Sequence, residues 1–337
     1  MTLQPVYNCL LGCFYNELTI RHRLRFPLEK WLLRRDYFQV IHCVVHGYSK
    51  LSGPHPGDLI EQFQQEFPVI RTVVPEFRDV KQAVNYARDY TRKHGFIAAA
   101  HNLKHAPFET TTYDSDSWNY LLLTEFTEKD ECRVYSPYNN EYAVVSAGQL
   151  EFMLDTAFNY RQAGKFTPYM YWECDDTQSI QKAMDRLDEL ELYRAAVQNY
   201  PLEFNLHEGR IYTESLKVMR EHIPPEQIRM QVNEIHAFHR ILLRSRQDLS
   251  GFLIGLGLEA GRDIDYLVHK WTRFNHLVAL AILRNSAGEY ERLYPQFEEL
   301  IRDEERLLKR LPDRFAAASP QSNLGKSGGD NDVHHRS

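Results

Sequence analysis

A cysteine near the start of the chain is the residue best placed to do chemistry. Leu11, Phe14 and Leu18 follow Cys9 at helical spacing, so a helix is expected to begin at or near this cysteine. A thiolate at a helix N-terminus is stabilised by the helix dipole and exposed amides, and a neighbouring imidazole can take its proton. Cys13, one helical turn further on, is expected in the core. The alternative is that Cys9 is also an ordinary buried residue.

Four residues further along the chain are candidates for the proton acceptor that Cys9 needs. His101 ends a short apolar run, His105 follows it, and Asp114 and Asp116 lie in the next polar stretch. The alternative is that His101 is a histidine on a buried strand and that the other three lie in a solvated loop. The fold decides how far each of them lies from Cys9.

Short apolar runs bounded by Gly, Pro or polar turns predict buried strands in the front half of the chain. These runs cover residues 42–45, 69–74, 96–101, 120–126, 132–135, 141–145 and 169–172. The three runs between 120 and 145 predict an antiparallel meander. Ser146 then predicts the N-cap of a helix that runs through Leu154 and Phe158.

From Asp176 onward the apolar period becomes helical, beginning with one charged helix that spans 180–192. Further helices are predicted over residues 212–221, 226–246, 264–284 and 289–310, with a break at Pro224-Pro225. The glycines between 255 and 261 follow a helical segment, where a dinucleotide loop would need a strand, so they predict a turn between helices. The polar tail from Ser319 is predicted to be disordered.

These patterns predict an α+β protein of two domains. A single core stops growing near about 250–300 residues, and this chain has 337. Residues 1–174 are expected to form a domain around an antiparallel sheet, and residues 175–312 an all-helical domain. Residues 313–337 are expected to form the disordered tail.

Composition excludes several classes of protein. A net charge of −6 argues against binding nucleic acid, and the densest basic stretch, 21–35, is interleaved with apolar residues as in an amphipathic segment. Five cysteines and an N-terminus without a charged start and apolar run indicate neither a disulfide framework nor secretion. The longest apolar run, near residues 252–258, is too short for a membrane span. A cytoplasmic location is therefore expected.

Histidines in the back half offer a metal site as an alternative that is not favoured. His236 and His239 lie three residues apart, and Asp265 and His269 occur at helical spacing on a later helix. The usual pair of Glu-x-x-His motifs is missing, so packing histidines are the preferred interpretation. The same holds for His334-His335 in the tail, and neither a metal nor a cofactor is expected.

Four segments of the front half stand out together. They are Tyr7-Asn8-Cys9-Leu-Leu-Gly-Cys13, Gly95-Phe-Ile-Ala, Asn119-Tyr-Leu-Leu-Leu-Thr and Val134-Tyr-Ser-Pro-Tyr138. They resemble the cysteine helix, two central strands and a turn of the butirosin-type acyltransferases, a family related to bacteriocin-processing peptidases. The resemblance covers about residues 5–160 and implies a papain-like N-terminal domain. It also implies transfer of an acyl group from a carrier-protein thioester to an amine acceptor in natural-product biosynthesis.

The resemblance also assigns roles to individual residues. Cys9 would be the nucleophile, and Gln4 or the backbone near Cys9 would line an oxyanion hole. Asn119 stands where the family has its base histidine, and Ser136 where it has the orienting aspartate. An asparagine amide cannot accept and return a proton near neutral pH, so these positions supply no Cys-His-Asp relay. His101 and His105 remain as alternative bases.

Two functions follow as expectations. The first is a peptide or polyketide biosynthesis protein that transfers an acyl group through Cys9 with a non-standard base. The second is a catalytically silent papain-like module, a pseudoenzyme that binds or scaffolds a biosynthetic assembly line. Both expect an acyl carrier protein or synthetase module as partner, with a small-molecule acceptor, and neither involves nucleic acid or a membrane.

Overall fold

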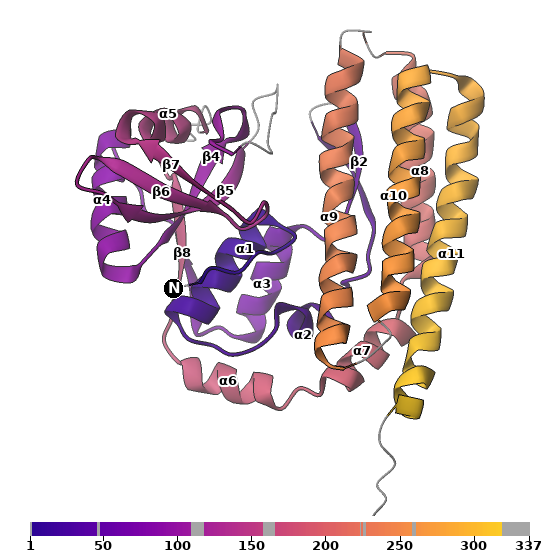
Figure 1. Cartoon of the computed structure of the whole chain (residues 1–337), viewed down its shortest axis with the longest axis horizontal. Helices are drawn as coiled ribbons and strands as arrows, with labels where there is room; N and C mark the ends of the chain where they lie inside the picture. Colours follow the sequence, from indigo (N-terminus) through magenta and orange to yellow (C-terminus); the bar gives the residue numbers. More distant parts are fainter. Residues whose placement is uncertain are drawn as a thin grey trace, which may run out of the picture.

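The structure is a computed structural model that describes residues 2–45, 48–108, 118–157, 166–222, 224, 227–257 and 261–318. Six strands form one antiparallel sheet in the order β3-β8-β4-β5-β6-β7 (Figure 1). They are β3 (Ile70–Val73), β4 (Ile97–Asn102), β5 (Trp118–Phe126), β6 (Glu131–Ser136), β7 (Glu141–Ser146) and β8 (Tyr169–Cys174). The chain thus combines helices with an antiparallel sheet, as the α+β prediction requires.

Helices cover both faces of this sheet. On one face lie α4 (Val80–His94) and α5 (Ala147–Ala157), and on the other lie α1 (Cys9–Asn16) and α3 (Pro56–Glu66). Successive side chains of a strand point to opposite faces. Up to Leu123, the α4–α5 face therefore takes the odd-numbered residues of β5, such as Leu121, and the α1 face takes the even-numbered ones, such as Leu122. A register shift between Leu123 and Glu125 then changes the parity, and Phe126 packs on the α4–α5 face.

Beyond β8 the described residues form helices. The short α6 (Thr177–Asp185) and α7 (Glu189–Gln198) lead to four long helices that lie side by side (Figure 1). These are α8 (Leu202–Arg220), α9 (Ile228–Gly255), α10 (Gly261–Arg284) and α11 (Ala287–Ala318). None of the described helices combines the length and apolar character that a membrane span needs.

A β-hairpin from near the start of the chain packs against these long helices. Its strands β1 (Ile41–Val45) and β2 (Tyr48–Ser52) pair antiparallel and run along α8, and β2 also contacts α9 (Figure 1). Asn205 fixes the entry to the hairpin, because its Oδ1 accepts the Val40 N–H at 2.8 Å and its Nδ2 donates to the Phe38 carbonyl at 3.0 Å. Packing therefore crosses residue 174, and the division into two domains stays a prediction.

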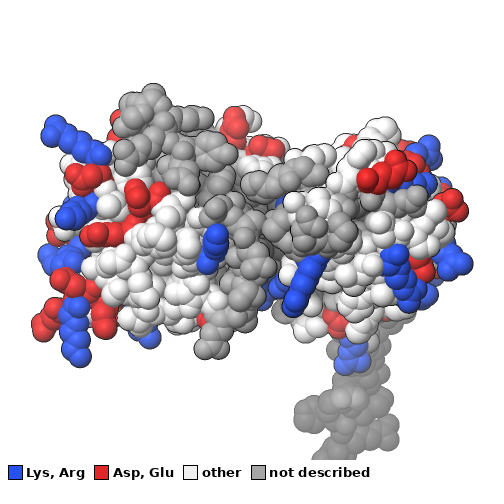
Figure 2. Space-filling model, turned by 90° about the horizontal axis from the view of Figure 1, so that it is seen from above, with Lys and Arg blue, Asp and Glu red and all other residues white. Residues whose placement is uncertain are grey.

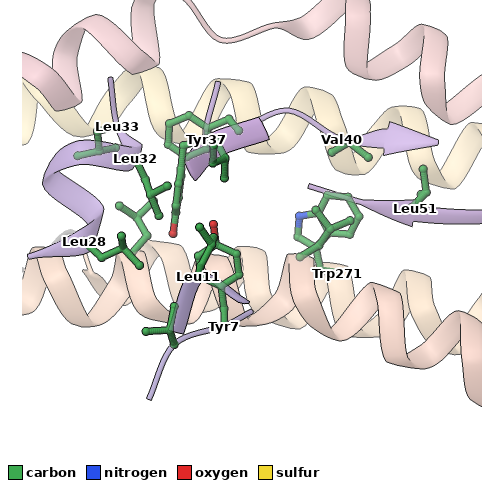
Figure 3. Packing of buried hydrophobic residues seen from close by; sticks show 14 of the residues in the cluster. Tyr7, Leu11, Leu28, Leu32, Leu33, Tyr37, Val40, Leu51 and Trp271 are labelled. Carbon is green, nitrogen blue, oxygen red and sulfur yellow. The ribbon is translucent and has the colours of Figure 1, made fainter. Parts of the chain in front are cut away.

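One apolar cluster extends from the α1 face of the sheet into the helices. It includes Tyr7, Leu11 and Tyr37, residues of α2 (Leu28–Leu32), and Trp271 of α10 (Figure 3). The ring of Tyr37 lies edge-on to Tyr7, with 6.3 Å between centroids. This shared core ties the first α-helices to the helical part of the chain.

A buried ion pair lies at the centre of the four long helices. Arg246 on α9 and Glu304 on α11 have side chains that are 1% and 0% exposed, and Nη2 of Arg246 lies 2.8 Å from Oε1 of Glu304. Glu304 also accepts hydrogen bonds from the Tyr200 hydroxyl at 2.9 Å and from Trp271 Nε1 at 2.7 Å. Both carboxylate oxygens therefore have donors, which a buried charge requires.

The predicted strands are confirmed with small shifts of their bounds, and so is the helix that follows Ser146. Ser146 and Gln149 form a capping box, in which the Ser146 N–H donates to Gln149 Oε1 at 2.9 Å and the Gln149 N–H donates to Ser146 Oγ at 3.3 Å. The helices predicted over 264–284 and 289–310 correspond to α10 and α11.

Three helix predictions were wrong in extent. The single helix over 180–192 is two helices, because Asp188 caps α7 by accepting the Glu191 N–H at 2.9 Å. The observed α8 begins ten residues before the predicted 212, and α9 continues nine residues beyond the predicted 246. The disordered tail predicted from residue 313 was wrong for residues 313–318, which belong to α11. The tail from Ser319, with His334-His335, lies outside the described residues.

Candidate functional site around the start of α1

Cys9 is the first residue of α1, as its spacing predicts. Asn8 caps the helix, since its Oδ1 accepts the backbone N–H groups of Leu10 at 3.0 Å and Leu11 at 3.2 Å. An asparagine at this position satisfies N–H groups that have no partner within the helix. The partly buried thiol therefore lies at the positive end of a helix dipole.

Two distant segments hold the start of α1. The Val6 N–H donates to the Pro137 carbonyl in the β6–β7 turn at 3.0 Å. The Tyr7 N–H donates to the carboxylate of Asp248 on α9. A Cβ at Gly12 would lie 2.3 Å from the Pro137 Cβ, so this turn of α1 needs glycine to reach its neighbour. The cysteine is thus placed by contacts from both the sheet and α9.

The surroundings of Cys9 keep its thiol protonated near neutral pH. Burial raises the pKa of Cys9 to about 11, although backbone N–H groups of Tyr120, Leu10 and Cys9 itself oppose the shift. Loss of hydration disfavours the thiolate, and these dipoles offset only part of that loss. As it stands, Cys9 is a weak nucleophile that has N–H groups in place for a negative charge.

Strand alternation puts His101 on the face of the sheet that packs with α4 and α5, together with Ile97. Asn119 pairs with His101 across β4 and β5, and its Oδ1 accepts the Tyr120 N–H at 2.8 Å, the same backbone N–H that acts on the Cys9 thiol. Burial lowers the pKa of His101 to about 4, opposed by the nearby Asn119 backbone. Neither nitrogen of His101 makes a regular hydrogen bond with any described residue.

The second candidate base also lies away from the thiol. The ring of His105 packs edge-on against Phe152 of α5, with 4.6 Å between centroids. It therefore belongs to the α5 side of the molecule. Asp114 and Asp116 lie outside the described residues.

Gln4 lies at the opposite end of α1 from Cys9. Its N–H donates to Asn16 Oδ1 at 2.7 Å, and its carbonyl accepts from Asn16 Nδ2 at 2.9 Å. Asn16 is the last residue of α1, which puts it about 10 Å along the helix from Cys9. These bonds fix the backbone of Gln4 against Asn16, while the Gln4 side chain is exposed, and its place in an oxyanion hole stays a prediction.

Ser136 acts in the turn that supports α1. Its buried Oγ accepts the Asn139 N–H at 3.2 Å, and its carbonyl accepts the Asn140 N–H at 2.9 Å. These bonds shape the turn that presents Pro137 to Gly12. The structure thus gives Ser136 a supporting place near the start of α1, and it gives no contact with an imidazole.

The sequence analysis missed the charged residues that surround the start of α1. Burial raises the pKa of Asp248 to about 6 and that of Glu29 to about 7, and the charge of Asp248 adds to the second shift. The positive charge of Arg244 opposes the rise in the pKa of Asp248. The Arg244 guanidinium lies 5.4 Å from the ring centroid of Tyr138. No motif marks these residues, because α2 and α9 come together only in the fold.

The histidines of the long helices pack and hydrogen-bond. His239 is 1% exposed, and its Nε2 lies 3.1 Å from the Tyr212 hydroxyl, while its ring stacks on Phe274. Asp265 accepts a hydrogen bond from Ser250 at 3.0 Å. Across the described ranges, no group of three or more His, Cys, Asp or Glu residues is arranged to hold a metal ion.

The surface charges are mixed on the face that Figure 2 shows, where Lys and Arg are interspersed with Asp and Glu. A continuous basic stripe of the kind that follows a phosphate backbone is not seen on that face. No protein-family model matches the sequence, and no curated protein matches it either.

Proposed function

We propose that this chain is a papain-like module of the butirosin acyltransferase type that binds an acyl carrier protein or synthetase module in natural-product biosynthesis, without a covalent intermediate. Support for the fold comes from the order of elements, a cysteine at the first position of a helix followed by an antiparallel sheet. In this proposal the helices from Thr177 onward form the second, all-helical domain.

One observation carries the non-covalent role. Strand alternation puts His101 on the α4–α5 face, whereas Cys9 lies on the α1 face, and Asn119 offers only an amide, which cannot accept a proton near neutral pH. A thiol whose pKa is about 11 needs a base or a cation beside it to become an activated nucleophile. Neither His101 nor His105 supplies one in this arrangement.

Arg244 is the residue we expect to meet the carrier. It lies beside Tyr138 and near Asp248, whose carboxylate binds the backbone two residues before Cys9. The thioester arm of a carrier protein contains a phosphate, which a guanidinium binds with paired hydrogen bonds. Arg244→Glu should weaken carrier binding at least tenfold in calorimetric titration, while Arg273→Glu on the exposed side of α10 and Cys9→Ala should bind as the wild type does.

A second candidate function, acyl transfer through Cys9, is favoured by the three backbone N–H groups that act on the sulfur. Intact-mass spectrometry after exposure to an acyl thioester at pH 7.5 separates the two functions. The non-covalent proposal expects no adduct on Cys9. A single adduct that is present in the wild type and in Cys174→Ala but absent from Cys9→Ala would overturn it in favour of transfer.

A further inference from the structure

The exposed side of α8 carries an apolar row with a regular spacing. Phe204, Ile211 and Val218 are 41%, 39% and 62% exposed and lie seven residues apart. Residues seven apart on an α-helix differ in direction by only about 20°, so the three side chains form one straight seam. A helix of a monomer normally turns such a seam inward.

The neighbours of α8 leave this seam open. On one flank, Arg210 turns toward α11, where its guanidinium lies 5.2 Å from the Tyr294 ring centroid and donates to the Tyr294 hydroxyl at 3.2 Å. On the other flank, Glu208 accepts the His42 N–H of β1 at 3.2 Å. Both neighbours lie beside the seam and leave its apolar side chains exposed.

We propose that the seam is the contact between two copies of this chain, which pair their α8 helices antiparallel about a two-fold axis at Ile211. A residue that precedes Ile211 by some number of positions then lies opposite the residue of the second copy that follows Ile211 by the same number. Phe204 therefore packs against Val218 of the second copy, and Ile211 against itself.

Charge on the flank next to α11 supports a second copy as the occupant. An axis perpendicular to both helices brings the same flank of the two copies together. Glu203 then lies within about 3 Å, along the helix axis, of Lys217 of the second copy. His207 comes within one residue of the level of Glu214 of the second copy. Within each copy Lys217 already pairs with Glu214 at 2.7 Å, so Glu203 of the second copy adds a second carboxylate to Lys217. This contact occurs twice about the axis, as between flanking residues of paired helices.

This inference does not rest on the proposed function. The seam has three apolar layers, so we expect a dissociation constant in the micromolar range. Sedimentation velocity of the full chain from about 1 to 100 µM should show a shift from monomer to dimer. A wild-type chain that stays monomeric throughout this range would overturn the proposal.

Substitution at the axis is the sharpest test. Ile211→Lys places two like charges opposite each other and should weaken the dimer at least tenfold. Leu283→Lys changes an equally apolar, 55% exposed residue of α10 and should leave the dimer intact. Equal dimerisation of Ile211→Lys and the wild type would exclude this interface.

The two-fold geometry also makes a positional prediction. Oxidation should link Ile211→Cys to itself, whereas Phe204→Cys should link only to Val218→Cys in the other copy. Linkage of Phe204→Cys to itself would reject the antiparallel register. Glu203→Lys and Lys217→Glu should each weaken the dimer, and the double exchange should restore it because the pairs are reversed.

Discussion

Near the start of α1, Asp248 and Glu29 share a half-buried space, whereas at the centre of the long helices Arg246 and Glu304 share a fully buried one. The carboxylates in these two places differ in the hydrogen-bond donors that surround them. Glu304 receives hydrogen bonds from a guanidinium, a hydroxyl and an indole. Burial raises the pKa of both Asp248 and Glu29. Arg244 and the Tyr7 N–H oppose the rise at Asp248, and the charge of Asp248 adds to the rise at Glu29.

The comparison shows that the supply of donors matters more than depth of burial. A carboxylate with several donors can hold its charge in a core, while one with few donors tends to take up a proton. The same rule applies to Cys9, whose thiol meets backbone N–H groups of Tyr120, Leu10 and Cys9 itself. Three measurements test this contrast.

The largest effect is expected when the donor-rich site is broken. Glu304→Leu leaves the buried guanidinium of Arg246 without a counter-charge, and it removes the acceptor of Tyr200 and Trp271. Loss of one partner of a buried ion pair costs about 3–5 kcal/mol. Urea denaturation should show this fall in the free energy of unfolding.

A matched control is Glu305→Leu, which breaks the surface pair with Lys309. Surface pairs contribute about 0–1 kcal/mol, so this variant should unfold close to the wild type. A Glu304→Leu variant as stable as Glu305→Leu would mean that the buried pair does not stabilise the native state in the way the structure indicates.

A smaller effect is expected from His239, a buried imidazole that interacts with the Tyr212 hydroxyl and the Asn275 side chain. Burial lowers its pKa to about 3, so below pH 6.5 the unfolded chain binds a proton that the folded chain does not. Stability should therefore fall as pH drops, by about 2–3 kcal/mol between pH 6.5 and 4.5 from this group alone. His239→Gln should flatten the curve of unfolding free energy against pH, and an unchanged slope would contradict the prediction. His269→Gln, at an exposed position on α10, should leave the slope as it is.

The smallest effect is expected at Glu29, and it has the opposite sign. Because its folded pKa is about 7 and its usual value is 4.5, the folded chain holds an extra proton between these pH values. Stability from this group is therefore present below pH 4.5 and is lost as pH rises through 7. The full shift corresponds to about 3 kcal/mol, and solvent around this half-buried side chain screens part of it. Glu29→Gln should therefore be more stable than the wild type by about 1–2 kcal/mol at pH 8 and equal to it at pH 4.5.

Glu128→Gln, in the exposed turn between β5 and β6, is the matched control for Glu29. Thermal unfolding at pH 8 and pH 4.5 should show a gain in stability at pH 8 for Glu29→Gln and none for Glu128→Gln. A Glu29→Gln variant that gains no stability at pH 8 would show that water or a neighbour already compensates its charge.

Local pattern predicted most of the sheet. Strands such as β4 stand out because a short apolar run ends at Gly95 on one side and at polar residues on the other. The capping box at Ser146 was equally local. The hairpin of β1 and β2 could not be placed, because its position depends on Asn205, which is 165 residues away from Val40.

The candidate site was predicted in part. The position of Cys9 at the start of a helix follows from the spacing of Leu11, Phe14 and Leu18, which is why it could be predicted, whereas the cap at Asn8 was found only in the structure. Period-two alternation indicates that His101 and Asn119 share a face, but only packing decides which face α1 covers. Glu29 lies in a stretch interpreted as the charged side of an amphipathic segment, and it is buried because α2 meets α9.

The hairpin wedged against α8 and α9 also sets the order in which the chain can fold. During synthesis, residues 37–52 leave the ribosome long before their packing partners are made. Phe38, Val40 and Leu51, which are buried in the folded chain, are exposed to solvent until then. Contacts so far apart in sequence slow folding, and exposed apolar segments invite aggregation or capture by chaperones. The hairpin of β1 and β2 therefore cannot complete its packing until α8 and α9, which end at Gly255, have been translated.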